Sequence, residues 1–428
     1  MGRFSHGDPV GPFRAREFGS GSLSVQTYIM YATSRAEMDI RDTHFYPQRS
    51  DDGMRYGVVG VECCAGGDFY AHLPQVTDRI GLETREIGES LRTLRRSLIS
   101  GDVDTYSLSS PPRGGGNPLT SRLEDEDRRI TAHLWPNRGL EIKEGYECSA
   151  RVRVVGRSMY VLEPLPITKP SSEALVFLHG YNCPTEYALL RLGQMLALGR
   201  FPSHIHPFVF SQATGQTFSY TKAKRCIGYF KTDLLDFLLD LRRRGYDQVH
   251  LLVHSMAAHL FFAMLQEYED RRFADPEGVD VLRLSNVVLI NADFPVRGFE
   301  EVHVPRVLEV ADRMTMYCDD RDFALLCSEL FSRNKVIGRK IWPVSARPAG
   351  GLPYGRSRID VMDCRHMQQN VHSIRHNYFN LNVQIVSDIA ELVTNHCGAD
   401  QRLTRTVRQV AGENVFSFLC PPKYVKNE

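Results

Sequence analysis

The sequence has no excess of charge of either sign and no long apolar run. Lysine and arginine number 52 against 51 aspartates and glutamates in 428 residues, which leaves a formal net charge of +1. Such a chain has no electrostatic field that would recruit nucleic acid or an anionic membrane. No stretch approaches the roughly 20 apolar residues of a membrane helix, and the N-terminal residues lack the apolar core of a signal peptide. We therefore expect a soluble, cytoplasmic protein without a membrane span that binds no nucleic acid.

Cysteine pairs with metal-binding spacing are also missing. The ten cysteines form no C-x-x-C pair, which gives a zinc ribbon or a redox dithiol little support. Four ligand-type side chains do gather late in the chain, at Cys364, His366, His372 and His376. They lack the apolar framework of a zinc module. We expect no metal and no other cofactor.

The chain divides into segments of different composition. Residues 1–20 are rich in Gly, Pro and Arg and predict a flexible tail, while residues 21–75 contain two β-type runs, at 24–33 and 55–64. Residues 76–150 predict a variable insert: an amphipathic helix at 76–98 leads into a polar, Gly- and Pro-rich stretch typical of disorder, and a protein partner could bind there. We expect the core at 165–400 and a C-terminal extension at 401–428.

From residue 173, short apolar runs alternate with longer segments of helical periodicity. This alternation predicts an α/β protein with a largely parallel sheet and helices on both faces. Active sites of such sheets gather at the carboxyl ends of the strands. The expected strands cover 174–180, 206–211, 248–255, 286–293 and 313–320, and the expected helices include 187–199 and 227–245.

Ser255 stands at one of these carboxyl ends. The apolar run 249–253 ends just before it, and apolar residues at helical spacing follow it. A serine at a strand-to-helix turn exposes its hydroxyl, and the amide of the next residue, Met256, points to where an oxyanion would develop. The turn departs from the G-x-S-x-G pattern, because β-branched Val253 stands where a small residue is usual. The alternative interpretation is an ordinary N-cap serine.

A second expected strand ends in His179 and Gly180. Glycine lets the backbone approach a substrate closely, and the loop after this strand supplies the other oxyanion amide in such sheets. We assign that amide to Tyr181 and treat His179, Gly180 and His254 as supporting residues. The alternative is a simple strand-to-loop turn.

A nucleophilic serine on this fold needs an acid and then a histidine later in the chain. Three aspartates follow the strand at 313–320, namely Asp319, Asp320 and Asp322, and three histidines follow later, namely His366, His372 and His376. His376 precedes an aromatic pair and an expected helix that could hold its loop. The residues alone leave both choices open.

These blocks together resemble a family of α/β-hydrolases of unknown function (DUF900-like) that is related to lipases and esterases. The resemblance implies an α/β-hydrolase fold with a mostly parallel central sheet, helices on both faces and N-terminal strands that join the sheet. It does not extend to the insert at 76–150. The blocks are MYATSR at 30–35, RYGVVGVE at 55–62, FLHGYN at 177–182, VHSM at 253–256, DFAL at 322–325 and HNYF at 376–379.

Matched position by position, the resemblance implies a catalytic triad of Ser255, Asp322 and His376, with Asp293 as an alternative acid. It carries the oxyanion amides over to Tyr181 and Met256. The implied activity is a serine hydrolase that cleaves an ester or related acyl bond of a small-molecule or lipid-like substrate through an acyl-enzyme. The alternative is a catalytically inactive protein that keeps the fold and binds a partner.

Overall fold

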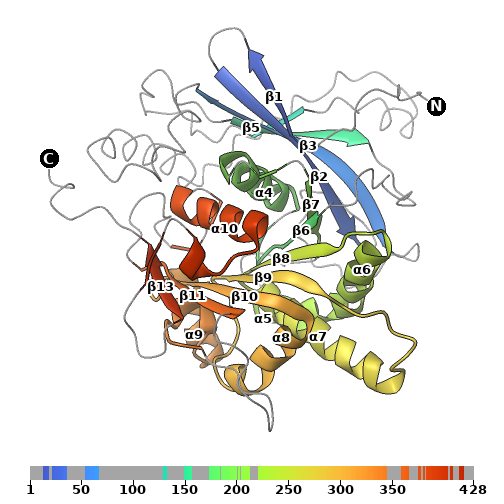
Figure 1. Cartoon of the computed structure of the whole chain (residues 1–428), viewed down its shortest axis with the longest axis vertical. Coiled ribbons are helices and arrows are strands. Elements are labelled where there is room, and N and C mark those ends of the chain that lie inside the picture. The colour runs from blue at the N-terminus through green and yellow to red at the C-terminus, as the bar shows by residue number, and fades with distance from the viewer. Residues whose placement is uncertain are drawn as a thin grey trace, which may run out of the picture.

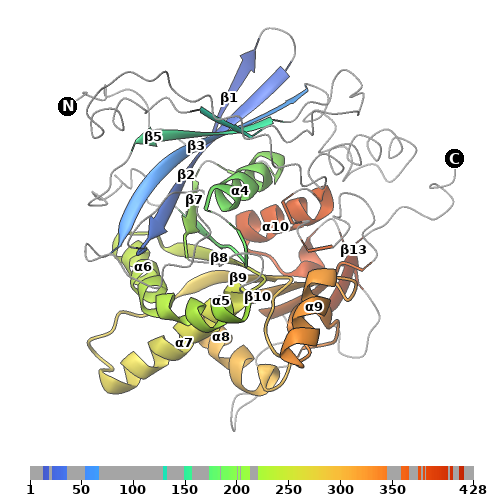
Figure 2. The same cartoon turned by 180° about the vertical axis from the view of Figure 1, so that it is seen from behind.

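The described residues form one sheet with helices on both of its faces (Figures 1 and 2). The computed structural model describes residues 13–18, 22–35, 54–66, 129–132, 149–156, 173–183, 185–199, 201–202, 204–212, 220–344, 358–365, 375–376, 379–380, 382–402, 405–407 and 414–418. Most of the predicted insert, the predicted helix at 76–98, and His366 and His372 lie outside these residues.

The sheet is built from 13 strands in the described part of the chain. They are β1 (Phe13–Phe18), β2 (Ser22–Thr33), β3 (Arg55–Gly66), β4 (Arg129–Ala132), β5 (Ser149–Gly156), β6 (Glu173–Leu178), β7 (Ile205–Phe210), β8 (Gln248–His254), β9 (Leu284–Ile290), β10 (Ala311–Cys318), β11 (Ile359–Asp363), β12 (Arg405–Val407) and β13 (Val415–Phe418).

In the part of the chain that the structure describes, the helices lie from residue 185 onward. They are α4 (Thr185–Gly199), α5 (Tyr220–Cys226), α6 (Lys231–Arg243), α7 (Ala257–Ala274), α8 (Val304–Val310), α9 (Phe323–Ser332) and α10 (Val383–Asn395). Short 3-10 helices cover Ile227–Phe230, Ile337–Arg339 and Ala399–Gln401, and a π-helical turn covers Phe299–His303.

Eight neighbouring strands run parallel, in the order β13-β11-β10-β9-β8-β6-β7-β2. The predicted α/β-hydrolase architecture is confirmed. The N-terminal strands join the same sheet as expected, since residues 30–32 of β2 pair with residues 208–210 of β7. The antiparallel strands β3, β5 and β4 extend the sheet beyond β2, and β12 pairs with β13 at the opposite edge.

Six of these strands lie where the sequence analysis expected none. β1 lies within the predicted tail, β4 falls within the predicted insert, and β5 joins the end of that insert to the core. β11 lies between β10 and α10 in the chain, and β12 and β13 belong to the segment after residue 400. β13 pairs in parallel with β11, so this part of the C-terminal segment is an integral strand of the central sheet.

Central strand β8 is apolar along most of its length because both of its faces are covered. Its residues alternate between the two faces. Val249, Leu251 and Val253 belong to a core that contains the buried side chains of α6, α7 and α8. On the other side, the ring of His254 packs 4.9 Å from that of Phe379, near α4 and α10, which lie together on that face (Figure 1).

None of the helices in the described ranges is both long and apolar enough to cross a membrane.

Candidate active site

The turn at Ser255 joins the end of β8 directly to α7. Ser255 has a φ of 57°, a left-handed conformation that costs a residue with a side chain about 1–3 kcal/mol. Backbone hydrogen bonds hold it there: its N–H donates to Ile290 O at 3.0 Å, and its carbonyl accepts from Asp293 N at 3.0 Å. The end of β9 therefore fixes the conformation of the serine, as expected for a nucleophile elbow.

Ser255, His376 and Asp322 form a continuous hydrogen-bonded chain. The Nε2 atom of His376 lies 2.8 Å from Ser255 Oγ, and its Nδ1 atom lies 2.6 Å from Asp322 Oδ2. The three residues come from the end of β8, the segment before α10 and the N-cap of α9. Residues far apart in the sequence thus meet at the carboxyl edge of the sheet, where such folds place their chemistry.

Asp322 is fixed by hydrogen bonds to both of its carboxylate oxygens. Its Oδ1 atom accepts from Leu325 N at 2.9 Å, which caps α9, while its Oδ2 atom also accepts from Asn291 Nδ2 at 2.5 Å. The carboxyl group is fully buried. Because both oxygens are occupied by donors, the group has one orientation, in which Oδ2 faces His376.

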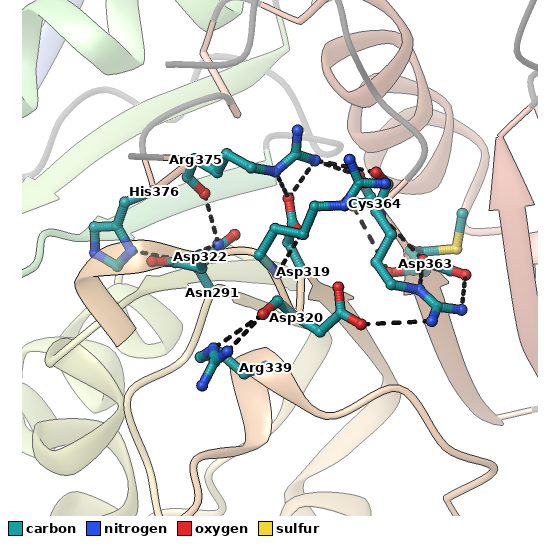
Figure 3. A network of polar contacts seen from close by, with 12 residues as sticks. Asn291, Asp319, Asp320, Asp322, Arg339, Asp363, Cys364, Arg375 and His376 are labelled. Atoms are coloured by element: carbon teal, nitrogen blue, oxygen red, sulfur yellow. Dashed lines mark hydrogen bonds and ion pairs between the residues drawn. The ribbon is translucent and has the colours of Figure 1, made fainter. Parts of the chain in front are cut away.

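A polar network holds the segment that carries His376 (Figure 3). Asn291 Nδ2 also donates to the carbonyl of Arg375 at 3.3 Å, so one side chain contacts both the acid and the histidine segment. The guanidinium of Arg375 donates from Nε to Asp319 Oδ2 at 2.6 Å and from Nη2 to Cys364 O at 3.0 Å. Arg375 thereby ties the segment to the ends of β10 and β11.

The three aspartates after β10 have different partners. Asp322 contacts His376, Asp319 binds Arg375, and the side chain of Asp320 lies 3.5 Å from Arg365 Nη1 (Figure 3). Burial raises the pKa of Asp319, although the hydrogen bonds and the charge of Arg375 oppose that rise. Of these three, Asp322 alone is hydrogen-bonded to the histidine in the structure.

Asp293, the alternative acid, lies in a different cluster. Its Oδ1 atom accepts from Ser328 Oγ at 2.7 Å, and its Oδ2 atom accepts from the Tyr220 hydroxyl. Burial, together with the charge of Asp293, raises the pKa of Tyr220. The ring of Tyr220 packs edge-on against that of Tyr181, with the centroids 5.5 Å apart. Asp293 therefore contacts Tyr220 beside Tyr181, whereas Asp322 is the carboxylate that is hydrogen-bonded to His376.

Gly180 passes close to the serine. A Cβ atom at this position would lie 2.9 Å from Ser255 Cβ, closer than real Cβ contacts, and 3.1 Å from His254 Nδ1, which is tighter than most of them. Glycine therefore allows the backbone to pass this close to Ser255. Met256 follows Ser255 and is the N-cap residue of the 18-residue helix α7, so its surroundings include the positive end of a helix dipole.

The two supporting histidines are buried behind the site. The Nε2 atom of His254 lies 3.1 Å from the carbonyl of His376, and the two rings are 4.8 Å apart. Burial, and to a lesser extent the charge of His376, keeps the pKa of His254 well below its usual value. Burial also lowers the pKa of His179 to about 3. Both rings are thus neutral at pH 7 and cannot compete with His376 as charged groups.

The β-branched Val253 is accommodated without displacing the serine. Its side chain is fully buried in the core on the α6 and α7 face, and its neighbours across the sheet are Leu178 and Leu289. Ser255 Oγ still lies within hydrogen-bond distance of His376. The crowding expected from the sequence therefore does not disrupt this geometry.

Sequence reasoning missed three residues that contact the candidate site residues or hold their segments, namely Asn291, Arg375 and Tyr220, and it considered Asp319 only as a candidate acid. Asn291 did carry a signal, because it is a polar residue at the end of an apolar strand, where site residues gather. Its φ of 44° is another left-handed conformation. Nothing in the local sequence indicates the partners of Arg375 or Tyr220, since both depend on contacts between distant segments.

Residues 162–396 match the model of a family described as alpha/beta hydrolase of unknown function (DUF900). The match spans more than half of the 428 residues, so the chain belongs to this family of α/β-hydrolases. The resemblance drawn from the sequence blocks is thereby confirmed. A search of curated proteins found no significant match.

Proposed function

We propose that the protein is a serine hydrolase that cleaves an ester or a related acyl bond, with Ser255 as the nucleophile. The observation that carries the proposal is the chain from Ser255 Oγ through His376 to Asp322, with contacts of 2.8 and 2.6 Å. A hydroxyl in reach of an imidazole that is oriented by a buried carboxylate is the arrangement that activates a serine. Membership of an α/β-hydrolase family supports the same reading.

The mechanism follows from these positions. His376 Nε2 takes the proton of Ser255 Oγ as that oxygen attacks the carbonyl carbon of the substrate, while Asp322 accepts a hydrogen bond from Nδ1–H and stabilises the imidazolium. The amides of Tyr181 and Met256 donate to the oxyanion of the tetrahedral intermediate. His376 then protonates the leaving group, and the acyl-enzyme forms. The same histidine then takes a proton from water as the water oxygen attacks the acyl carbon, and it gives that proton to Ser255 Oγ as the acyl–Oγ bond breaks and the acid leaves.

A fluorophosphonate probe tests the nucleophile on the purified full chain. We expect covalent labelling of the wild-type protein at Ser255 and none of Ser255→Ala. The matched control is Ser285→Ala: Ser285 is also 5% exposed, but it lies near the amino end of β9 and binds Gln248. This control should label like the wild type, and circular dichroism checks that each variant is folded.

Hydrolysis of short p-nitrophenyl esters tests the acid. We expect Asp322→Asn to lower kcat by about 10³–10⁴-fold, because an amide opposite Nδ1 favours the wrong histidine tautomer while it can still cap α9. Asp293→Asn should lower kcat less than about tenfold, since Asp293 contacts Tyr220 and Ser328. Folded wild-type protein that neither labels nor hydrolyses any ester of the series would contradict the proposal and favour a binding protein.

A further inference from the structure

A second cluster of side chains that could bind a ligand lies at the amino-terminal ends of the central strands, whereas Ser255 lies at their carboxyl-terminal ends. Glu173 is the first residue of β6, His250 is the third residue of β8, and His396 is the C-cap of α10. Five residues of chain separate His250 from Ser255, which corresponds to about 16 Å at the rise of a strand. We propose that Glu173, His250 and His396 form a binding site for a divalent transition-metal ion of the zinc class.

The three ligand atoms converge on one point. Glu173 Oε2 lies 2.9 Å from His250 Nε2, Glu173 Oε1 lies 3.2 Å from His396 Nε2, and all the ligand atoms lie within 4.8 Å of one another. Tetrahedral ligands at the usual 2.0–2.1 Å from zinc are separated by about 3.3 Å. Small side-chain movements therefore suffice to place an ion between the three groups.

The donor set suits such an ion. Two imidazoles and one carboxylate are a common three-ligand set for zinc, with a fourth position for water or another side chain. His204 stands next to that position, since its Nε2 atom lies 3.9 Å from Glu173 Oε1 and its side chain is 37% exposed. Among the residues that the structure describes, this is the group of His, Cys, Asp and Glu side chains with metal-binding geometry.

Asn286 on β9 orients the buried histidine. His250 is fully buried, and its Nδ1 atom accepts from Asn286 Nδ2 at 2.8 Å, which leaves Nε2 facing Glu173. Metal-binding histidines usually have such a partner on the second ring nitrogen. When Nε2 binds an ion, Nε2 loses its proton and Nδ1 takes one up, so the ring changes to its other neutral tautomer and the Asn286 amide turns its oxygen toward the new Nδ1–H. The same neighbour thus serves both forms.

The cluster is accessible from solvent. The side chains of His396 and Glu173 are 39% and 12% exposed, so an ion can enter from solvent. His250 lies at the buried end of the cluster, and His396 lies at its exposed end.

The bound ion would join three elements that are distant in the sequence. It would connect β6 and β8 to the C-terminal end of α10, whose N-terminal end follows the segment that carries His376. The site is separate from the proposed nucleophile, so the ion stabilises the fold and takes no part in acyl transfer. Binding to the folded state alone stabilises a protein in proportion to the logarithm of ligand excess over Kd.

Isothermal titration of chelator-treated full chain with Zn²⁺ tests this site, together with melting curves. We expect one ion per chain and a rise in Tm when Zn²⁺ is added. Glu173→Gln and His396→Asn should each weaken binding at least tenfold and reduce the rise in Tm. Asparagine is chosen at 396 because the position has a φ of 51°, which asparagine tolerates.

Two controls separate this site from others on the chain. Glu267→Gln removes a comparable carboxylate, one that pairs with Lys231 and Arg271. This variant should bind Zn²⁺ like the wild type. Ser255→Ala should also bind Zn²⁺ like the wild type. Co²⁺ in place of Zn²⁺ should give visible absorption without a thiolate charge-transfer band. The proposal is overturned if the wild type binds no ion, if Glu173→Gln and His396→Asn bind as tightly as the wild type, or if a thiolate band appears.

Discussion

At Gly180 the chain passes so close to Ser255 that no side chain fits between them. The position has no need of positive φ, so its requirement for glycine is one of space alone. Ser255 is left-handed and Gly180 lies close to it, and the residues that follow each of them, Met256 and Tyr181, carry the amides that we propose for the oxyanion. The geometry of the proposed oxyanion site therefore depends on the missing Cβ atom at Gly180 and on the left-handed backbone of Ser255.

Gly180→Ala should disable the site. The new methyl group would lie 2.9 Å from Ser255 Cβ, so the backbone of residues 180–181 must move away and the amide of Tyr181 with it. We expect fluorophosphonate labelling to slow by about 10²–10³-fold, the usual effect of losing one oxyanion donor. Gly228→Ala is the matched control, because a Cβ atom there meets nothing within 4 Å. Equal labelling of the two variants would show that the close approach is unimportant.

The residues of the proposed triad have signals in the sequence, whereas the residues that hold them in place do not. A strand-to-helix turn has a signature within one short segment, which indicates Ser255, and the family blocks indicate Asp322 and His376; their catalytic roles stay predictions. Asn291 and Arg375 act through contacts over 31 and 84 residues of sequence separation. Such contacts leave no periodic or local pattern, so one sequence does not reveal them.

Arg375 and His376 lie between β11 and α10 and belong to neither a helix nor a strand. Hydrogen bonds of Arg375 with Asp319, Asn291 and Cys364, at the end of β11, hold these two residues in place. Asp319 is fully buried, so this ion pair is shielded from water. Removing one partner of such a pair leaves an uncompensated buried charge.

Arg375→Ala should separate positioning from binding. We expect kcat for ester hydrolysis to fall about 10–100-fold with KM little changed, because His376 loses its fixed place relative to Ser255 while no substrate contact is removed. Addition of Asp319→Asn should recover part of the stability lost, since the unpaired carboxylate disappears. Arg365→Ala is the control: its guanidinium pairs with Asp363, and its labelling should stay close to that of the wild type. A change in KM alone would argue against positioning.

The central strands were predicted within three residues of their observed ends, because buried parallel strands are apolar on both faces.

β11 was missed because it contains charged residues. Its five residues are Ile359–Asp363, and all are buried, including two aspartates. Asp360 pairs with Arg402 and Arg313, and Asp363 pairs with Arg365. Aspartates that are neutralised by arginines outside the strand make this buried strand resemble a polar loop in the sequence.

At the scale of the whole molecule, the sheet separates two sets of histidines with different surroundings. His250 and His396 contact the carboxylate of Glu173 at the amino-terminal ends of the strands, whereas His179 and His254 are buried at the carboxyl-terminal ends, near Ser255. An apolar environment disfavours the charged imidazole, which is why the pKa of His179 is lowered to about 3. Because the folded protein keeps these two rings unprotonated, its free energy of unfolding is larger at neutral pH than at acid pH.

The sign of this effect gives a test of the whole fold. Between pH 6.5 and about 3, His179 binds a proton in the unfolded chain but not in the folded one, so the free energy of unfolding falls as the pH falls through this window. The contribution is about 1.4 kcal/mol per pH unit below 6.5, or about 2 kcal/mol at pH 5. His179→Leu, which cannot take up a proton, should therefore lose about 2 kcal/mol less stability than the wild type between pH 7.5 and pH 5. Urea denaturation of both proteins measures this, with a chelator present so that no metal is bound. The two profiles should run parallel above pH 7.5, and equal slopes below pH 6.5 would mean that His179 is protonated in the folded protein.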